Sequence, residues 1–294
     1  MLGLLDNSLQ RMFGLPYLFV SRDFNIHCRC RYLLHKLRAL KGGNLSLLDV
    51  GCGAGITLRH LSADAPGKVG RYVGIDLQAE RLSGRYRDIH DIDVAFHNVN
   101  LDDDWRVGQF DVVWCSEVIE HLIDDLGQMR KMMAAVKPGG LVLMTTPCLA
   151  FVRQMGRSFP PILQTSAVQD GGHVRHGYNA RDIKRLAAEA GLDVASIDGI
   201  NPLTPAETRR RYTAKGAFWI LNNIRMTFRS SKQQGFALGD AFEASPERYA
   251  SIGAVLARPV APARSRPAPE VIQVSKPDRP VDQPTAGCAP IPAH

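Results

Sequence analysis

The chain has 294 residues, of which 45% are hydrophobic and 22% charged, and its formal net charge is +7. This length and composition predict one large folded domain with appendages, and the scattered cysteines do not resemble a disulfide framework. No apolar run is long enough to cross a bilayer, and the first residues lack the order of a secretory signal. We therefore expect a cytoplasmic protein with reduced thiols.

Positive charge is concentrated in two flanking segments. Residues 1–43 carry a balance of +5 and residues 200–232 a balance of +6, so the remainder of the chain is net acidic. Two basic flanks predict an anionic partner, such as a phosphorylated substrate, acidic lipid headgroups or nucleic acid. Solvated charge that only keeps the protein soluble is the alternative.

Taken in order, the chain begins with a segment, 1–43, that we expect to form a basic helical extension. A domain at 44–258 follows, in which short apolar runs alternate with stretches of helical spacing. This alternation predicts an α/β, doubly wound, mostly parallel, seven-stranded sheet. The predicted strands are 45–51, 72–77, 94–99, 110–115, 140–146, 193–200 and 249–258, and the predicted helices are 55–63, 78–88, 122–136 and 180–191.

Two further segments complete the chain. A basic insertion at 200–248 carries apolar residues between arginines, namely Phe218, Trp219, Ile220, Leu221, Ile224, Met226 and Phe228. They predict a helix that covers a pocket, rests at a membrane surface or meets RNA. Residues 259–294 are rich in proline and have no apolar periodicity, which predicts a disordered tail.

The stretch "LLDVGCGAG" places Gly51, Gly53 and Gly55 after an apolar strand and before a helix. A strand that turns sharply beside a ligand needs residues without side chains, and nucleotide-like ligands bind at such turns in doubly wound sheets. Asp76 closes the next strand, where a carboxylate can accept hydrogen bonds from ribose hydroxyls. A dinucleotide fingerprint would need glycine where Ile56 stands, and no Walker lysine follows.

With Asp49 ahead of the glycines, this stretch resembles motif I of class I S-adenosylmethionine-dependent methyltransferases of the type 11/23 kind. "YVGIDL", "NVNLDD", "FDVVWCSEVIEHL" and "VKPGGLVLMTTP" resemble the later motifs of that family, in the same order. The resemblance implies a Rossmann-like fold and S-adenosyl-L-methionine as cofactor.

The resemblance also implies roles for particular residues. The glycine loop would contact the methionine part of the cofactor and Asp49 its amino group. Asp76 would bind the ribose, and Ser116 would emerge beside the cofactor at the end of the fourth strand. Leu77 would pack on the adenine, which Asn100 and Leu101 would border. Asn100 stands where the family often has aspartate, and Asp102 is the alternative.

The segment "SEVIEHL" holds Glu117, Glu120 and His121 at the edge where ligands collect. Three interpretations remain open. In the first, the glutamates stabilise the first turn of a helix and His121 packs against its neighbours. In the second, His121 or one of the glutamates is a general base for a hydroxyl acceptor. In the third, the group binds a divalent cation. His173 and His176 are substrate-side candidates in both catalytic interpretations.

"EVIEH" resembles both quinone-biosynthesis O-methyltransferases and bacterial small-RNA 3′-terminal 2′-O-methyltransferases. In the RNA enzymes, Glu-x-x-Glu-His joins a downstream histidine to hold a metal. "TTPC" departs from the Thr-Pro-Asn of those enzymes, so the main interpretation assigns no metal.

We therefore predict a methyltransferase that acts on a small or lipid-linked metabolite, of which an anionic one would suit the basic flanks, at a hydroxyl oxygen, in a glycan, quinone or natural-product pathway. The alternatives are a metal-assisted RNA 2′-O-methyltransferase and a cofactor-binding but inactive accessory subunit. Peripheral membrane contact is compatible with the basic and apolar insertion. The sequence specifies neither the acceptor nor the oligomeric state.

Overall fold

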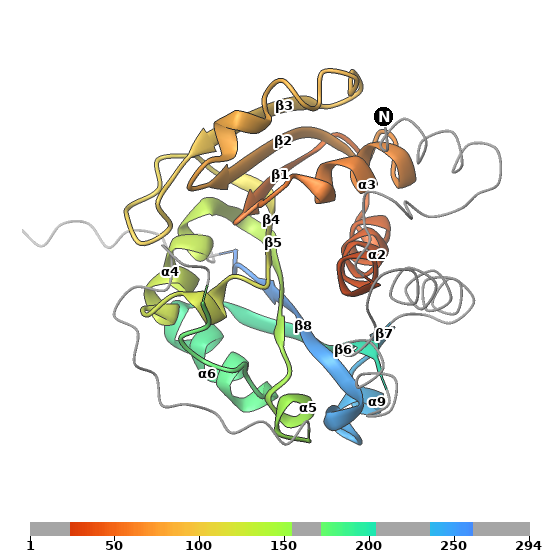
Figure 1. Cartoon of the computed structure of the whole chain (residues 1–294), viewed down its shortest axis with the longest axis vertical. Coiled ribbons are helices and arrows are strands. Elements are labelled where there is room, and N and C mark those ends of the chain that lie inside the picture. Colours follow the sequence, from red (N-terminus) through yellow and green to blue (C-terminus); the bar gives the residue numbers. More distant parts are fainter. Residues whose placement is uncertain (1–23, 155–171, 204–235, 261–294) are drawn as a thin grey trace, which may run out of the picture. The chain divides into compact units, whose positions relative to one another are not determined.

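The computed structural model describes residues 24–154, 172–203 and 236–260 (Figure 1). The first part of the expected extension, the apolar and basic stretch of the insertion, and the tail from residue 261 lie outside these residues. No helix in the described ranges is both long and apolar enough to cross a membrane.

Eight strands form one sheet, in the order β3-β2-β1-β4-β5-β8-β6-β7. Their bounds are β1 Leu45–Val50, β2 Val69–Asp76, β3 Asp93–Asn98, β4 Phe110–Ser116, β5 Val136–Pro147, β6 Asp193–Pro202, β7 Phe236–Ala237 and β8 Tyr249–Ala257. Strands β1 to β5 pair in parallel, whereas β8 is antiparallel to both β5 and β6. The strand order reverses between β1 and β4, and ligands bind at the carboxyl edge beside such a reversal.

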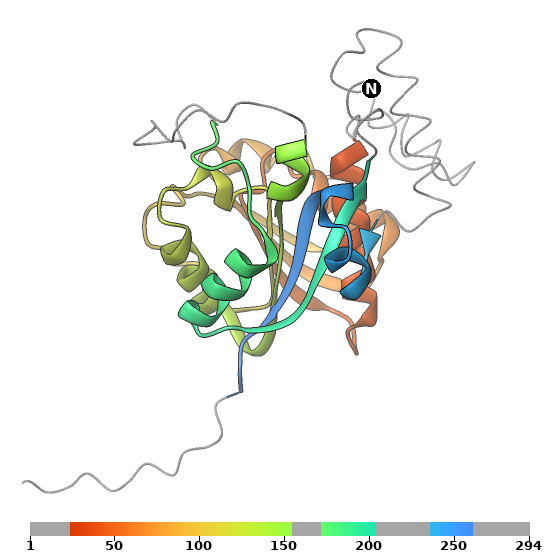
Figure 2. The same cartoon turned by 90° about the horizontal axis from the view of Figure 1, so that it is seen from below.

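Helices cover both faces of the sheet (Figure 2). Helices α4 and α6 lie on one side, and α2 and α3 lie on the other. The bounds are α2 Phe24–Ala39, α3 Ile56–Asp64, α4 Asp125–Ala135, α5 Leu149–Gln154, α6 Ala180–Ala190 and α9 Asp240–Glu243, with 3-10 turns η1 Ala79–Leu82, η2 Ile119–His121 and η3 Pro246–Arg248. The strongly amphipathic α6 begins with a capping box between Asn179 and Asp182.

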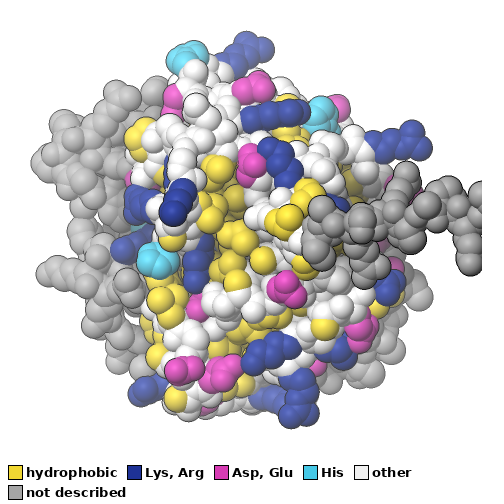
Figure 3. All heavy atoms as spheres, turned by 180° about the vertical axis from the view of Figure 1, so that it is seen from behind, with side chains coloured by type: hydrophobic (Ala, Val, Ile, Leu, Met, Phe, Trp, Pro, Cys, Tyr) yellow, Lys and Arg dark blue, Asp and Glu magenta, His cyan; other side chains and the backbone are white. Residues whose placement is uncertain are grey.

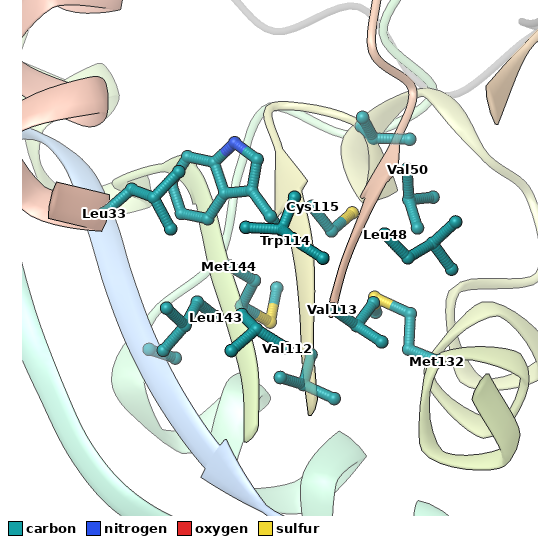
Figure 4. Close-up of a cluster of buried hydrophobic side chains, with 14 of the residues drawn as sticks. Leu33, Leu48, Val50, Val112, Val113, Trp114, Cys115, Met132, Leu143 and Met144 are labelled. Carbon is teal, nitrogen blue, oxygen red and sulfur yellow. The ribbon is translucent and has the colours of Figure 1, made fainter. Parts of the chain in front are cut away.

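The core lies on both faces of the central strands (Figure 4). Because side chains alternate along β4, Trp114 points toward Leu33 of α2, whereas Val113 points toward Met132 of α4. All four side chains are at most 1% exposed. This two-sided burial explains why the strands are nearly continuous apolar runs in the sequence.

A buried carboxylate fixes α2 against the sheet. Asp198 of β6 is 0% exposed. It accepts a hydrogen bond of 2.8 Å from the hydroxyl of Tyr32 and lies 2.7 Å from the amine of Lys36. The Gly239 N–H donates to its other oxygen at 3.1 Å. Helix α2 is therefore held by a buried, paired charge as well as by apolar packing.

Two sequence predictions about the fold are wrong. The sheet has eight strands rather than seven, because the two-residue β7 pairs with Gly199 and Ile200. Such a strand is too short to show alternation. The predicted helix at 78–88 is only the 3-10 turn η1, and the chain after it is held instead by Tyr86. The hydroxyl of Tyr86 donates to the Ala54 carbonyl in the glycine loop.

Candidate functional site

The glycine loop between β1 and α3 has the geometry that its sequence predicts. Gly51, Gly53 and Gly55 all have left-handed backbones, with φ of 68°, 54° and 70°. A Cβ on Gly51 would lie 2.5 Å from a methyl of Val118, so the chain after β4 packs directly on this loop. A Cβ on Gly53 would have no heavy atom within 4 Å. Gly53 therefore faces open space, as a cradle for a ligand requires.

Asp76 ends β2 beside this loop. Its Oδ2 accepts a hydrogen bond of 3.0 Å from the Gly53 N–H, which holds the carboxylate at the carboxyl edge of the sheet. The next residue, Leu77, is 42% exposed although it is a large apolar side chain. The backbone loop, the carboxylate and the exposed leucine fit a nucleoside whose flat aromatic base packs on the leucine.

Asp49 lies beneath the loop and is 1% exposed. The hydroxyl of Tyr72 donates to its carboxylate at 2.6 Å, and Thr57 provides a second hydrogen bond. Burial raises the pKa of Asp49 to about 7, and the two hydrogen bonds oppose this rise. A nearby cation, such as the amino group of the cofactor, would favour the charged form.

Asn100 and Leu101 lie in the loop after β3. The side chain of Asn100 accepts a hydrogen bond of 3.2 Å from the Asp102 N–H, and Leu101 is buried. The amine of Lys131, on α4, donates to the carbonyls of Leu101, Asp102 and Asp103, each at 2.8 Å. Helix α4 thus fixes the loop in which the sequence predicts the adenine contacts.

The end of β4 differs from the helical turn that one interpretation proposed. Ser116 hydrogen-bonds through its hydroxyl to Thr145 at 2.9 Å. Glu117 then has a left-handed φ of 55°, which is unusual for a residue other than glycine, asparagine or aspartate. Between β4 and α4 the helical turn is η2, which begins at Ile119. The interpretation in which Glu117 stabilises the first turn of a helix is therefore wrong.

Glu117 is turned toward α2. One of its carboxylate oxygens lies 3.2 Å from the guanidinium of Arg29, and the other is buried without a hydrogen-bond partner. Strained backbone that the surroundings maintain is typical of functional sites. Arg29 was not among the sequence-predicted site residues, because nothing in the sequence links it to a residue so distant along the chain.

Glu120 is 0% exposed. Its Oε2 accepts a hydrogen bond of 3.2 Å from the Thr146 hydroxyl, whereas Oε1 has no hydrogen-bond partner. Burial, together with the neighbouring Glu117, raises the pKa of Glu120 well above its ordinary range. A buried oxygen of this kind requires a proton, a cation or a ligand donor.

His121 and His173 complete a cluster with Glu120. The His121 Nδ1 lies 3.0 Å from the Gly172 carbonyl, and its Nε2 lies 3.9 Å from Glu120 Oε1. The His173 ring stands edge-on to that of His121, with centroids 4.5 Å apart. Partial burial and the imidazoles of His121 and His176 lower the pKa of His173.

One ligand atom from each of Glu120, His121 and His173 lies within 4.8 Å of the others. A carboxylate and two imidazoles match the ligand types of Zn²⁺, Mn²⁺ and related divalent cations. Of the sequence candidates, Glu117 and His176 lie outside this group in the described structure. Glu120, which the main interpretation left out, lies within it.

The fold and the glycine-loop site define a class I S-adenosylmethionine-dependent methyltransferase. A family model described as "Methyltransferase domain" matches residues 23–197, and the chain belongs to that family. It is therefore a transferase whose cofactor is S-adenosyl-L-methionine.

Curated relatives agree with this assignment. The chain is 31% identical over 169 residues to a ubiquinone biosynthesis O-methyltransferase of Hydrogenovibrio crunogenus, a match that covers 54% of this chain and 68% of the relative. It is 29% identical over 202 residues to the enzyme of the same description from Methylococcus capsulatus, covering 65% and 78%. A solved complex of the Haloferax volcanii Trm112 methyltransferase activator with a methyltransferase matches with a TM-score of 0.50 and 19% identity, over 81% of this chain and 93% of that chain. This last match supports the fold alone.

Proposed function

We propose that this methyltransferase transfers the methyl group to a hydroxyl oxygen of a small or lipid-linked metabolite, of the quinone-precursor type. The observation that carries the proposal is the group formed by Glu120 and His121, which follow β4, and His173, which precedes α6. A hydroxyl must lose its proton during methylation, and such a group can remove it. The names of the two curated relatives support the same acceptor class.

The cofactor supplies an electrophilic methyl group on its sulfonium. The residues of this chain must hold the acceptor in line, exclude water and take up the proton. His121 suits the last task, because a hydrogen bond to the Gly172 carbonyl requires the proton on Nδ1 and leaves the Nε2 lone pair available. We assign the glycine loop, Asp76 and Leu77 to the cofactor, with Asp49 close to its amino group.

A divalent cation at Glu120, His121 and His173 would provide a second route to the same chemistry. Such an ion would lower the pKa of a bound hydroxyl and orient it, which are general functions of catalytic metals. The unpartnered Glu120 Oε1 favours this arrangement. It keeps a metal-assisted RNA 2′-O-methyltransferase as the second candidate function, since a ribose presents two neighbouring hydroxyls.

The charge distribution on one face of the described residues supports a metabolite more than RNA. On the face drawn in Figure 3, Lys and Arg side chains are interspersed with Asp, Glu and hydrophobic side chains. Mixed charge of this kind is typical of an ordinary solvated surface.

We also propose that the protein acts in the cytoplasm and that its basic, apolar insertion contacts the membrane surface when the acceptor is lipid-linked.

The test uses the full chain, methyl-labelled cofactor and three acceptors. These are a dihydroxylated aromatic ring with an isoprenoid tail, the same ring without a tail, and a short RNA with a free 3′-terminal ribose. We expect label in the ring compounds. If label appeared only in the RNA, and not in a control RNA whose terminal ribose lacks the 2′-hydroxyl, the second candidate function would replace this proposal.

A second experiment tests the group of Glu120, His121 and His173. Each reaction is repeated after chelation and after return of Mg²⁺, Mn²⁺ or Zn²⁺, and with His121→Asn. The matched control is His97→Asn, because His97 is exposed on β3. We expect His121→Asn to lower turnover by about 100-fold or more, in the range of general-base catalysis, and His97→Asn to leave it unchanged. Equal turnover in both variants would remove His121 from the mechanism.

A further inference from the structure

We infer that Arg175 is the positioning residue that docks segment 172–178 on the η2 turn and thereby sets the orientation of His121 and His173. The inference rests on the proposed function, in which these two histidines act on the acceptor. His173 lies far along the chain from Glu120 and His121, so a defined contact between the two segments is needed to assemble the group.

The side chain of Arg175 provides that contact. Its Nη1 donates to the carbonyl of Ile119 at 3.0 Å and also to that of Leu122, while Nη2 donates to the Ile123 carbonyl at 2.9 Å. Carbonyls at and after the end of a short helical turn have few backbone partners, although that of Ile119 also accepts the Leu122 N–H at 3.3 Å. The planar, permanently charged guanidinium satisfies several of them at once, which a lysine amine cannot do in the same geometry.

The backbone of the segment adds a second set of contacts. The N–H groups of Val174 and Arg175 donate to the Glu120 carbonyl at 2.9 and 3.2 Å. Gly177 has a φ of 139°, and a Cβ there would lie 2.3 Å from the Pro147 carbonyl, so the chain passes directly over the end of β5. The segment thus bridges the ends of β4 and β5, where the acceptor must bind.

Tyr178 anchors the far end of the segment. Its hydroxyl donates to Asp125 at 3.0 Å, and Asp125 lies 3.6 Å from the Arg175 guanidinium. Arg175 Nη1 also donates to the tyrosine hydroxyl at 3.1 Å. Because these three side chains hold one another, the guanidinium has a fixed orientation and can transmit it to the η2 turn.

The docked segment determines the state of His121. A carbonyl only accepts hydrogen bonds, so the contact of 3.0 Å with Gly172 places the proton on Nδ1 and leaves Nε2 as a base or metal ligand. The next residue, His173, is held edge-on to the same ring. If segment 172–178 were displaced, the fixed tautomer and the second imidazole would be lost together.

The test compares Arg175→Ala and Arg175→Lys with Arg185→Ala. Arg185 is the matched control because it lies exposed on α6 and forms an ion pair with Glu189 on the same helix. Three quantities are measured on the full chain: the ¹⁵N shifts of the His121 imidazole, the affinity for Mn²⁺ and the affinity for S-adenosylmethionine. None requires turnover, so failure of the proposed function, seen as no methyl transfer by the wild type, is distinguished from failure of this inference.

We expect both Arg175 variants to lose the Nδ1-protonated signature of His121. Mn²⁺ affinity should fall by about 10- to 100-fold, as is typical when a residue that orients a metal ligand is removed. Cofactor affinity should stay within about twofold. Added guanidinium should restore the signature in Arg175→Ala, an effect that a purely structural defect would not show. If Arg175→Ala does not fold, Arg175→Lys decides alone, and wild-type imidazole shifts in a folded Arg175 variant would overturn the inference.

Discussion

The guanidinium of Arg29 lies 3.2 Å from the carboxylate of Glu117, so helix α2 reaches the end of β4 at the cofactor edge of the sheet. Both side chains are largely buried, at 17% and 19% exposure. The pair therefore links α2 to the left-handed residue at the end of β4. A segment before β1 thus belongs to the site as much as the strand ends do.

Breaking this pair should destabilise the protein. We expect Arg29→Gln to lower the free energy of unfolding by about 2 kcal/mol, between the values typical of exposed and of buried ion pairs, because Glu117 is left without its counter-ion. Glu117→Gln in the same chain should recover part of the loss. Urea unfolding of the two single variants and the double variant measures the coupling, and strictly additive effects would show that the two side chains do not interact.

Alanine substitutions should distinguish a glycine that contacts the cofactor from one that only shapes the backbone. Gly53→Ala and Gly67→Ala both place a Cβ in open space on a left-handed backbone, so each should cost about 1–2 kcal/mol of stability. Only Gly53 faces the proposed cofactor site. We expect calorimetry to show cofactor affinity lowered by at least about 100-fold in Gly53→Ala and unchanged in Gly67→Ala. Equal affinities would place the cofactor elsewhere.

Gly51→Ala should differ from both. Its Cβ would lie 2.5 Å from Val118, so the strain of overpacking adds to that of the backbone. We expect a loss of about 3 kcal/mol in unfolding free energy, measured by thermal or urea unfolding. A variant as stable as Gly67→Ala would show that Val118 moves aside freely.

Cofactor affinity should depend on pH through Asp49. Burial raises the pKa of this carboxyl to about 7, and the amino group of the cofactor favours the carboxylate. Below pH 7 the carboxyl must release a proton on binding, so affinity should fall by about tenfold per pH unit and level off above pH 7. Calorimetry from pH 5.5 to 8 should show this slope in the wild type and a flat profile in Asp49→Asn. If wild type and Asp49→Asn showed the same pH dependence of cofactor affinity, Asp49 would not interact with the amino group of the cofactor.

Stability toward acid should depend on His27, which is 5% exposed on α2. Burial, together with the neighbouring His60 and Arg31, lowers its pKa from 6.5 to about 3. At a pH between these two pKa values, the histidine binds a proton in the unfolded chain but not in the folded chain. The free energy of unfolding therefore falls as the pH is lowered from 6.5 toward 3. The loss should be on the order of 4 kcal/mol.

The comparison that isolates this effect is His27→Phe, which keeps the ring volume and removes the titration. Unfolding free energies of the two proteins should converge as the pH falls from 6.5 to 3 if the variant starts less stable. A wild-type pH slope identical to that of the variant would show that His27 titrates normally in the folded protein.

Several features were predictable because their causes are local. Gly51, Gly53 and Asp76 lie at the ends of strands whose apolar runs are plain in the sequence, and a sharp turn beside a ligand requires those residue types. The resemblance to methyltransferases followed from the same segments. The seventh predicted strand, at 249–258, is the observed β8. Its antiparallel position between β5 and β6 depends on the topology of the whole sheet and not on the local sequence.

The sequence by itself determined the main strands of the sheet and the glycine loop, since both follow from short-range patterning and backbone conformation. Its resemblance to methyltransferases implied the cofactor class. Only the tertiary structure decided that Glu117 faces Arg29 and that Arg175 brings His173 to Glu120 and His121. These contacts join segments far apart along the chain, and their geometry depends on how helices and loops pack over the sheet edge. No local spacing encodes it, because a Glu-x-x-Glu-His run is compatible with a helix, a 3-10 turn or a left-handed kink until its neighbours are in place.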